Sequence, residues 1–235
     1  MSNDYLEHYE RGLLQGPGWG PAGWLRRLLD RRARALGQAD RHALFLPRVL
    51  ALAGLNETAR PLDVLEVGCG SGWALSYRSP GVRYWAVDRG DRFKAELEAR
   101  GIAFHQLDVG AEALPFADGA FDLVLLNHVI EHVAAGDFLA AELARVLRPR
   151  AHLYVRTPNV ERLGARFHDD PTHVAPYTPA ALTEHLGSHG FAPVVLFHSD
   201  HPRITLDILS GGRLRALLMS ARLGGKEIEA LFVKR

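Results

Sequence analysis

The sequence of 235 residues has one cysteine, Cys69, so it cannot form an internal disulfide, and a reducing compartment is expected. It has no apolar run long enough to cross a membrane. Near its start, Asp4, Glu7 and Glu10 stand where a targeting signal would be basic and then apolar. We therefore expect a cytoplasmic protein that does not associate with a membrane.

An excess of charge of either sign is also lacking. The 28 lysines and arginines stand against 27 acidic residues, which gives a formal net charge of +1. A protein that binds nucleic acid over a broad surface usually carries a clear positive excess. We therefore expect a small-molecule partner and no nucleic acid. Binding to nucleic acid would need a local cluster of basic residues.

Between residues 62 and 155, short apolar runs alternate with helical stretches, a pattern typical of βαβ units and a parallel sheet. Thr178 and Pro179 predict the start of a later helix, and Gly190 its end. The fold class is α/β, a doubly wound sheet with helices on both faces, and we expect one domain over residues 61–235. The predicted strands are 64–67, 84–87, 103–107, 121–126, 152–155, 194–197, 204–208 and 228–233, and the other predicted helices are 136–147 and about 214–219.

Residues 1–60 are predicted to form an N-terminal helical extension. Apolar residues recur at helical spacing from Trp24 to Leu29, and Pro47 is expected to open a second helix. The aromatic residues of this segment would suit a lid or a wall of the substrate site. They would equally suit simple packing of the appended helices on the core. These aromatic residues are Tyr5, Tyr9, Trp19 and Trp24.

The first predicted strand runs directly into Gly68-Cys69-Gly70-Ser71-Gly72. Such a loop lets the backbone turn sharply and approach a ligand without an intervening side chain, although it could also simply join a strand to a helix. Asp88 ends the next strand, where a carboxylate can accept hydrogen bonds from ribose hydroxyls. Asp108 ends the strand after that and could equally be a turn residue or a helix cap. The combination predicts a cofactor that contains a nucleoside.

The class of nucleoside cofactor follows from Trp73. A dinucleotide-binding loop needs glycine or alanine at this position, because the next helix must pack closely on the strand. No Gly-Lys-Ser/Thr sequence follows to bind a nucleotide triphosphate. These observations favour a cofactor without phosphate groups.

The segment Val64-Leu65-Glu66-Val67-Gly68-Cys69-Gly70-Ser71-Gly72 resembles the first motif of class I S-adenosylmethionine-dependent methyltransferases. The segments 127–133, 143–149 and 157–159 resemble the branch that includes quinone-biosynthesis methyltransferases. The resemblance implies a Rossmann-like sheet of seven strands, S-adenosylmethionine as the cofactor and S-adenosylhomocysteine as the product. It also implies that the cofactor-binding residues are Glu66, Gly68, Cys69, Gly70, Asp88, Asp108, Val109 and Asn127.

The sequence departs from the family pattern at two places. Only residues 73–81 separate the glycine-rich loop from the second strand, so the first helix must be short and could present Trp73 or Tyr77 to the cofactor. Arg150 and Ala151 stand where the family usually has two glycines.

Residues 170–174, together with Tyr177-Thr178-Pro179, resemble a segment of methyltransferases that modify sugars and polysaccharides. The resemblance implies a hydroxyl acceptor on a sugar or similar metabolite. One alternative is methylation of RNA at a ribose 2′-hydroxyl, for which the arginines between residues 26 and 34 would contact phosphates. These arginines could equally form a solvated helix face with Asp30. A binding module without catalysis is the other alternative.

We predict that His128 and His173 are the catalytic residues, because a histidine can accept a proton near neutral pH. If a helix starts after the fourth strand, His128, Glu131 and His132 would share a face that His173 could reach. The set resembles the metal site of small-RNA 3′-terminal 2′-O-methyltransferases, with His128 in place of a glutamate. A divalent metal is therefore an alternative, but it is not part of the predicted cofactor set.

Overall fold

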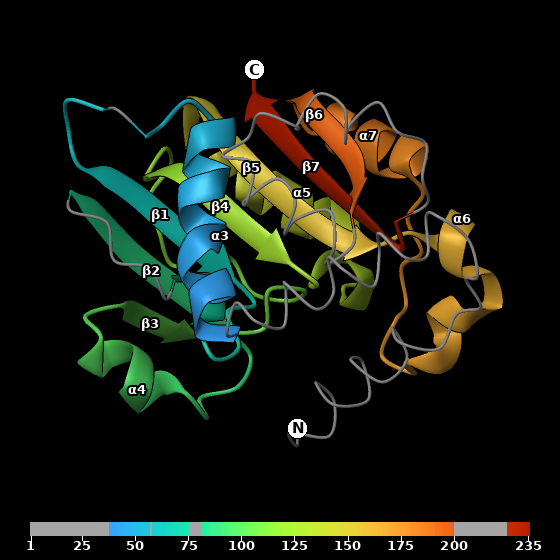
Figure 1. The fold of residues 1–235 in the computed structure, drawn as a ribbon, viewed down its shortest axis with the longest axis horizontal. Coiled ribbons are helices and arrows are strands. Elements are labelled where there is room, and N and C mark those ends of the chain that lie inside the picture. The colour runs from blue at the N-terminus through green and yellow to red at the C-terminus, as the bar shows by residue number, and fades with distance from the viewer. Residues whose placement is uncertain (1–37, 57, 76–80, 200–224) are drawn as a thin grey trace.

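The computed structural model describes residues 38–56, 58–75, 81–199 and 225–235. Its strands form one mixed sheet of seven strands in the order β3-β2-β1-β4-β5-β7-β6 (Figure 1). Strands β1 to β5 run parallel, while β7 is antiparallel to both β5 and β6. This topology confirms the predicted doubly wound α/β fold. The strands are β1 (Leu62–Val67), β2 (Val82–Asp88), β3 (Ala103–Gln106), β4 (Phe121–Asn127), β5 (Leu147–Pro158), β6 (Phe191–Ser199) and β7 (Glu227–Lys234).

Helices cover both faces of the sheet (Figure 1). Helix α3 (Gln38–Leu52) packs on one face, and α5 (Gly136–Val146) and α7 (Pro179–Ser188) pack on the other. Val64 belongs to the cluster of buried side chains under α3, and Leu65 belongs to the cluster under α5 and α7. Every residue of β1 and β4 is buried, because a central parallel strand has apolar neighbours on both faces.

The remaining elements are short. Helix α4 (Lys94–Ala99) precedes β3, and α6 (Val160–Leu163) follows β5 beyond the carboxyl ends of the parallel strands (Figure 1). The 3-10 turns are η1 (Trp73–Leu75), η2 (Ile130–His132) and η3 (Gly164–Asp169).

The predicted strands over residues 64–155 are confirmed, and so are the helices at 136–147 and after Pro179. The expectation that Pro47 opens a helix is wrong, because Pro47 lies inside α3. Proline removes one helical hydrogen bond, but burial of Phe45, Leu46 and Val49 on the sheet offsets this cost. The helix from Trp24 and the elements expected at 204–208 and 214–219 lie outside the described residues. Within the described segments, no helix is long and apolar enough to cross a membrane.

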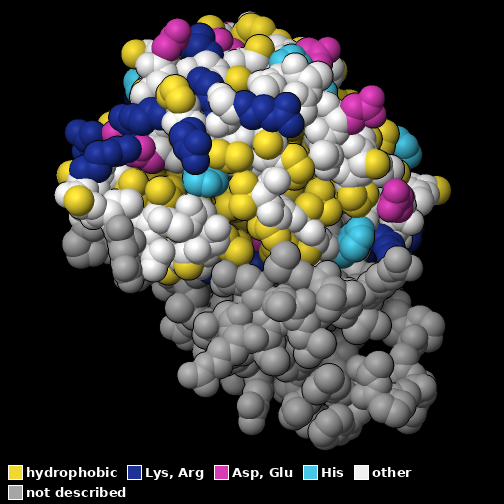
Figure 2. All heavy atoms as spheres, turned by 90° about the horizontal axis from the view of Figure 1, so that it is seen from above, with side chains coloured by type: hydrophobic (Ala, Val, Ile, Leu, Met, Phe, Trp, Pro, Cys, Tyr) yellow, Lys and Arg dark blue, Asp and Glu magenta, His cyan; other side chains and the backbone are white. Residues whose placement is uncertain are grey.

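Arginines at the amino-terminal ends of the parallel strands are paired with buried carboxylates. The side chains of Arg83 and Arg148 bind Asp63 at 2.7 and 2.9 Å, and Arg60 and Arg148 bind Asp122. Figure 2, which views the molecule from the top of Figure 1, shows Lys and Arg side chains gathered on one side with acidic side chains among them. The side chains of the three arginines named here therefore bind carboxylates of the protein itself.

Candidate active site

Three glycines allow the chain to turn sharply where β1 ends. Gly68, Gly70 and Gly72 all have positive φ angles, of 67°, 50° and 66°, which side chains with a Cβ rarely adopt. The amide groups of Gly68 and Cys69 donate hydrogen bonds to the carbonyl oxygen of Val87, at 2.8 and 3.2 Å. The loop is therefore held against the carboxyl end of β2.

The three glycines differ in what surrounds them. A Cβ at Gly68 would lie 2.3 Å from Val129 Cγ2, and a Cβ at Gly72 would lie 2.3 Å from Leu97 Cδ2, so packing alone requires glycine at both positions. A Cβ at Gly70 would have no atom within 4 Å. The open space at Gly70 is therefore the place where a ligand can approach the backbone.

Asp88 is the last residue of β2, as predicted, whereas Asp108 lies two residues beyond the end of β3. The amide of Gly70 donates a hydrogen bond to Asp88 Oδ2 at 2.8 Å, so the carboxylate lies directly beside the glycine-rich loop. Asp108 Oδ1 accepts a hydrogen bond from the amide of Gly110 at 2.9 Å and thereby holds a turn. Val109 packs against the buried cluster. These positions are compatible with the predicted ribose and adenine ends of the cofactor site.

Glu66 and Asn127 form a buried polar pair at the carboxyl ends of β1 and β4. Asn127 Nδ2 donates a hydrogen bond to Glu66 Oε1 at 3.4 Å. Within the described structure, Glu66 Oε2 and Asn127 Oδ1 are buried without a hydrogen-bond partner. Burial raises the pKa of Glu66 to about 8, although the hydrogen bond from Asn127 lowers it in part. Two unsatisfied acceptors predict a ligand that carries donor groups, such as an ammonium or a hydroxyl.

Cys69 contributes its backbone to the loop, while its side chain points into the protein. The thiol is buried in the cluster under α3, and its exposed fraction is 1%. Burial raises the pKa of the thiol well above its usual range, so it is not a reactive thiolate.

The described part of the segment after the glycine-rich loop is the single turn η1. The indole of Trp73 packs edge to face against Phe45 of α3, with ring centroids 4.9 Å apart. The guanidinium of Arg100 donates to the carbonyl oxygens of Gly72 and Leu75, both at 3.0 Å. This guanidinium therefore fixes the end of the loop. Tyr77 lies outside the described residues.

The segment after β4 differs from the prediction. The expected α-helix is the 3-10 turn η2, and His128 precedes it with a φ of 52°. His128, Glu131 and His132 therefore do not share one helical face. The left-handed backbone at His128 directs the chain across the carboxyl end of β4, and its amide donates to the Arg156 carbonyl at 2.8 Å.

His128 lies between two carboxylates. Its Nδ1 is 3.2 Å from Glu131 Oε1, and its Nε2 is 3.5 Å from Glu227 Oε1. Burial lowers the pKa of His128, but its hydrogen bonds with Glu131 and Glu227 outweigh burial and raise the pKa to about 9. Arg156 Nε also donates to Glu227, at 2.7 Å. Both nitrogens of the His128 ring thus face an acidic partner.

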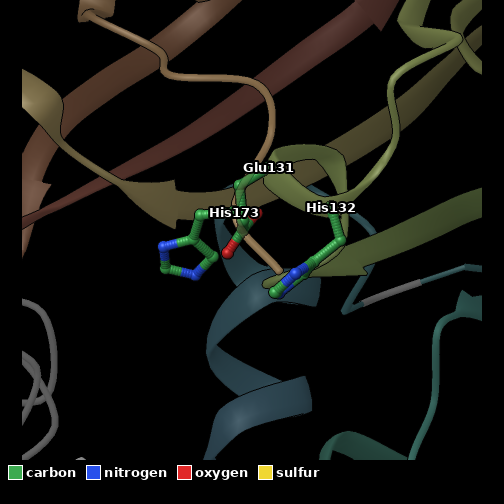
Figure 3. Close-up of side chains that lie close together, drawn as sticks. All are labelled: Glu131, His132 and His173. Carbon is green, nitrogen blue, oxygen red and sulfur yellow. The ribbon is translucent and has the colours of Figure 1, made fainter. Parts of the chain in front are cut away.

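His173 approaches the same place from the segment after β5. Glu131, His132 and His173 each offer one donor atom, and these three atoms lie within 4.8 Å of one another. In Figure 3 the carboxylate of Glu131 lies between the two imidazole rings. The structure therefore brings together the three later residues of the predicted set, and His128 contacts them through Glu131.

Glu227 and Thr157 were not predicted from the sequence. Thr157 Oγ1 donates a hydrogen bond to Glu131 Oε2 at 2.9 Å. Glu227 reaches the site because β7 runs antiparallel to β5, with Glu227 opposite Pro158. Thr157 lies in the segment 157–159 that resembles the family, but no role was predicted for its side chain. Glu227 belongs to no such segment, although a glutamate at the start of a closing apolar strand is a signal that could have been noticed.

The fold and the site define a Rossmann-like methyltransferase class of protein, and comparison with known sequences agrees. A family described as a methyltransferase domain matches residues 65–155. A probable S-adenosylmethionine-dependent methyltransferase of Mycolicibacterium smegmatis is 32% identical over 200 residues, which are 83% of this chain and 72% of the relative. The chain belongs to the S-adenosylmethionine-dependent methyltransferase family.

Other matches differ in length and in name. A probable S-adenosylmethionine-dependent methyltransferase of Mycobacterium tuberculosis is 32% identical over 75% of this chain, and the match spans 61% of that relative. A malonyl-[acyl-carrier protein] O-methyltransferase of Erwinia billingiae is 30% identical over 54% of this chain and 53% of its own length. A human thiol S-methyltransferase is 33% identical over 43% of this chain and 46% of its own length.

The fold is also similar to that of solved structures. A putative sarcosine dimethylglycine methyltransferase from Galdieria sulphuraria has a TM-score of 0.61 at 17% identity, over 83% of this chain and 85% of that chain. At this identity the similarity shows the fold alone.

Proposed function

We propose that the protein transfers a methyl group from S-adenosylmethionine to a hydroxyl group of a small molecule, such as a sugar or a similar metabolite. The observation that carries the proposal is the pair of buried acceptors, Glu66 Oε2 and Asn127 Oδ1, at the same sheet edge as the open space at Gly70. A cofactor with an ammonium group, ribose hydroxyls and no phosphate fits this combination of acceptors and open backbone.

Each residue of the cofactor site has a distinct role in this proposal. Gly70 leaves room for the cofactor, and Asp88 offers carboxylate oxygens to ribose hydroxyls. Glu66 and Asn127 accept hydrogen bonds from the ammonium group. S-adenosylmethionine, when bound, supplies a methyl group that its positively charged sulfur already activates. The protein must therefore hold the acceptor in line and provide for the loss of its proton.

A hydroxyl acceptor needs help to lose its proton, whereas an amine or a thiolate needs less. His173 supports the proposal of a hydroxyl acceptor, because its Nε2 is buried without a hydrogen-bond partner and can take a proton or bind a cation. His128 is less suited to taking a proton, because both of its ring nitrogens face carboxylates. We propose that His173 acts on the reacting hydroxyl, either as a proton acceptor or through a bound cation, and that His128 positions Glu131.

RNA and a thiol are the other acceptor classes to compare with a hydroxyl, and a binding module without catalysis is a further alternative. The arginines expected to contact RNA, between residues 26 and 34, lie outside the described residues, and Arg60, Arg83 and Arg148 are paired with carboxylates. Transfer to a thiol has the similarity to the human thiol S-methyltransferase in its favour. Cofactor binding with no transfer to any acceptor would indicate a binding module.

The test is transfer of a radiolabelled methyl group to a panel of sugars, phenols, thiols, amines and short RNAs. We expect labelling of a hydroxyl compound and a loss of kcat of about 100-fold in His173→Ala. His128→Ala should also lower kcat, while His189→Ala, which removes a ring paired with the exposed Asp137 of α5, should retain the parent rate. Labelling of thiols or RNA alone would contradict the hydroxyl proposal, and full activity in both His128→Ala and His173→Ala would contradict the roles of these histidines.

A further inference from the structure

We propose that Glu131, His132 and His173 form a binding site for one divalent transition-metal cation at the carboxyl edge of the sheet. One donor atom from each side chain lies within 4.8 Å of the other two (Figure 3). A cation about 2.1 Å from each donor would bring these atoms to about 3 to 3.5 Å from one another. Small side-chain rotations would supply this contraction, because the three atoms already lie within 4.8 Å of one another.

The ring of His173 is oriented as a metal ligand requires. Its Nδ1 lies 2.7 Å from the carbonyl oxygen of Phe167, and a carbonyl can only accept, so Nδ1 carries the hydrogen. The lone pair of the neutral ring is therefore on Nε2. This atom is buried without a hydrogen-bond partner, and the His173 side chain is only 9% exposed. The nearest carboxylate oxygen, Oδ2 of Asp170, is 3.8 Å away.

His132 is oriented in the same way by Thr172. Its Nδ1 lies 3.1 Å from the carbonyl oxygen of Thr172 and 3.0 Å from Thr172 Oγ1. The hydroxyl hydrogen of Thr172 is directed to Asp170 Oδ1, at 2.6 Å. Nδ1 of His132 must therefore donate to the carbonyl, which leaves the lone pair on Nε2. Protein metal sites commonly fix a histidine ligand by such a hydrogen bond from its other nitrogen.

Glu131 supplies the negative charge and ties the two histidine segments together. Its side chain is fully buried, Oε2 accepts from Thr157 at 2.9 Å, and Oε1 lies 3.2 Å from His128. Each carboxylate oxygen keeps a further lone pair for a cation. The carbonyl oxygen of Glu131 accepts from the amides of Val174 and Ala175, at 2.8 and 3.0 Å. The segment that carries His173 is therefore fixed to η2 before any cation binds.

Two imidazoles and one carboxylate favour a first-row transition metal over magnesium or calcium, which prefer oxygen ligands. Three protein ligands also leave coordination positions open for water and for an acceptor hydroxyl. A cation there would lower the pKa of that hydroxyl, whose proton would pass to solvent, and His173 would then act as a ligand and not as a proton acceptor. This role rests on the proposed function, whereas cation binding itself requires neither cofactor nor acceptor.

The chain offers an internal control for weak surface binding. Among the described residues, Asp137, His185 and His189 also bring three donor atoms within 4.8 Å of one another. The Asp137 side chain is 85% exposed, and His189 Nε2 already bonds to it at 3.0 Å. The carboxylate of this group is exposed and already paired with His189, so the group should bind a cation more weakly than the site whose carboxylate, Glu131, is fully buried.

The experiment uses the full chain after EDTA treatment and desalting, with no cofactor present. Co²⁺ is titrated in while its visible absorption is recorded, for the parent, for His132→Gln/His173→Gln and for His185→Gln/His189→Gln. We expect the parent and His185→Gln/His189→Gln to bind one equivalent of Co²⁺ tightly. His132→Gln/His173→Gln should bind Co²⁺ more weakly by about ten-fold or more. Circular dichroism establishes that each variant is folded.

A measurement on the parent alone covers the case in which His132→Gln/His173→Gln does not fold. Added Mn²⁺ should broaden the imidazole NMR signals of His132 and His173 before those of His185 and His189. Tight binding that survives His132→Gln/His173→Gln, broadening that starts at His185 and His189, or no binding at all would each overturn the proposal. Calorimetry on the same samples measures binding of S-adenosylmethionine. It therefore tests the proposed function independently of cation binding.

Discussion

The amide of Gly70 donates a hydrogen bond to Asp88 Oδ2 at 2.8 Å, which ties the open part of the glycine-rich loop to the end of β2. Asp88 Oδ1 accepts from the amide of Gly90 at 2.9 Å. The carboxylate is thus fixed by two backbone amides before any ligand binds. Such preorganisation lowers the cost of presenting its remaining lone pairs to ribose hydroxyls.

Asp88→Asn should weaken S-adenosylmethionine binding with little effect on the fold. The amide keeps one acceptor oxygen but loses the charge, and a hydrogen bond to a charged group contributes about 1.5 to 3 kcal/mol. We expect a Kd at least about ten-fold higher in calorimetry. An unchanged Kd would show that Asp88 does not contact the cofactor.

Gly70→Val should abolish binding of S-adenosylmethionine, because the branched side chain would fill the space where the backbone is open. Gly54→Val is the matched control. Gly54 has a φ of 67° and equally open surroundings, but it lies in the turn after α3. Both variants should lose similar stability through backbone strain, and only Gly70→Val should lose the cofactor. Equal Kd values in the two variants would refute the assignment of the loop.

Glu66 should make the cofactor-free protein less stable as the pH rises. Burial raises its pKa from 4.5 to about 8, so between these values the folded protein binds the proton more tightly than the unfolded chain. The free energy of unfolding therefore falls as pH rises through this window and levels off above pH 8. We expect the free energy of unfolding, measured with urea, to fall between pH 6 and pH 9 by about 3 kcal/mol more in the parent than in Glu66→Gln. If the free energy of unfolding changed with pH in the same way in both proteins, this would contradict the burial of the Glu66 carboxyl.

Arg150→Gly should stabilise the protein. Arg150 has a φ of 64°, and a residue with a Cβ loses about 1–2 kcal/mol in this conformation. Glycine removes the strain but adds freedom to the unfolded chain, so we expect a net gain of about 0.5–1 kcal/mol. Thermal unfolding measures it, with Arg150→Ala as the control that should gain nothing. A lower melting temperature for Arg150→Gly would mean that the arginine side chain stabilises this turn.

Local sequence pattern was sufficient for most of the fold. Alternating apolar runs located the parallel strands, and the loop from Gly68 to Gly72 located the cofactor side of the sheet. These features depend on neighbours in sequence, which is why a single sequence reveals them.

The arrangement of the histidines could not be predicted in the same way. His128 has a left-handed backbone, and its ring lies between Glu131 and Glu227. Glu227 comes from β7, far later in the chain. The ring orientation of His132 depends on Thr172, also distant in sequence. Contacts of this kind are set by strand order and packing, which periodicity does not encode.

Isothermal titration of the full chain with S-adenosylmethionine and with S-adenosylhomocysteine tests the central claim most directly. The site formed by Glu66, Gly70, Asp88 and Asn127 predicts saturable binding of one equivalent of each ligand. It also predicts that Gly70→Val abolishes binding, whereas Gly54→Val retains it. Absence of binding of both ligands to a folded parent protein would contradict the cofactor site and the methyl transfer proposed from it.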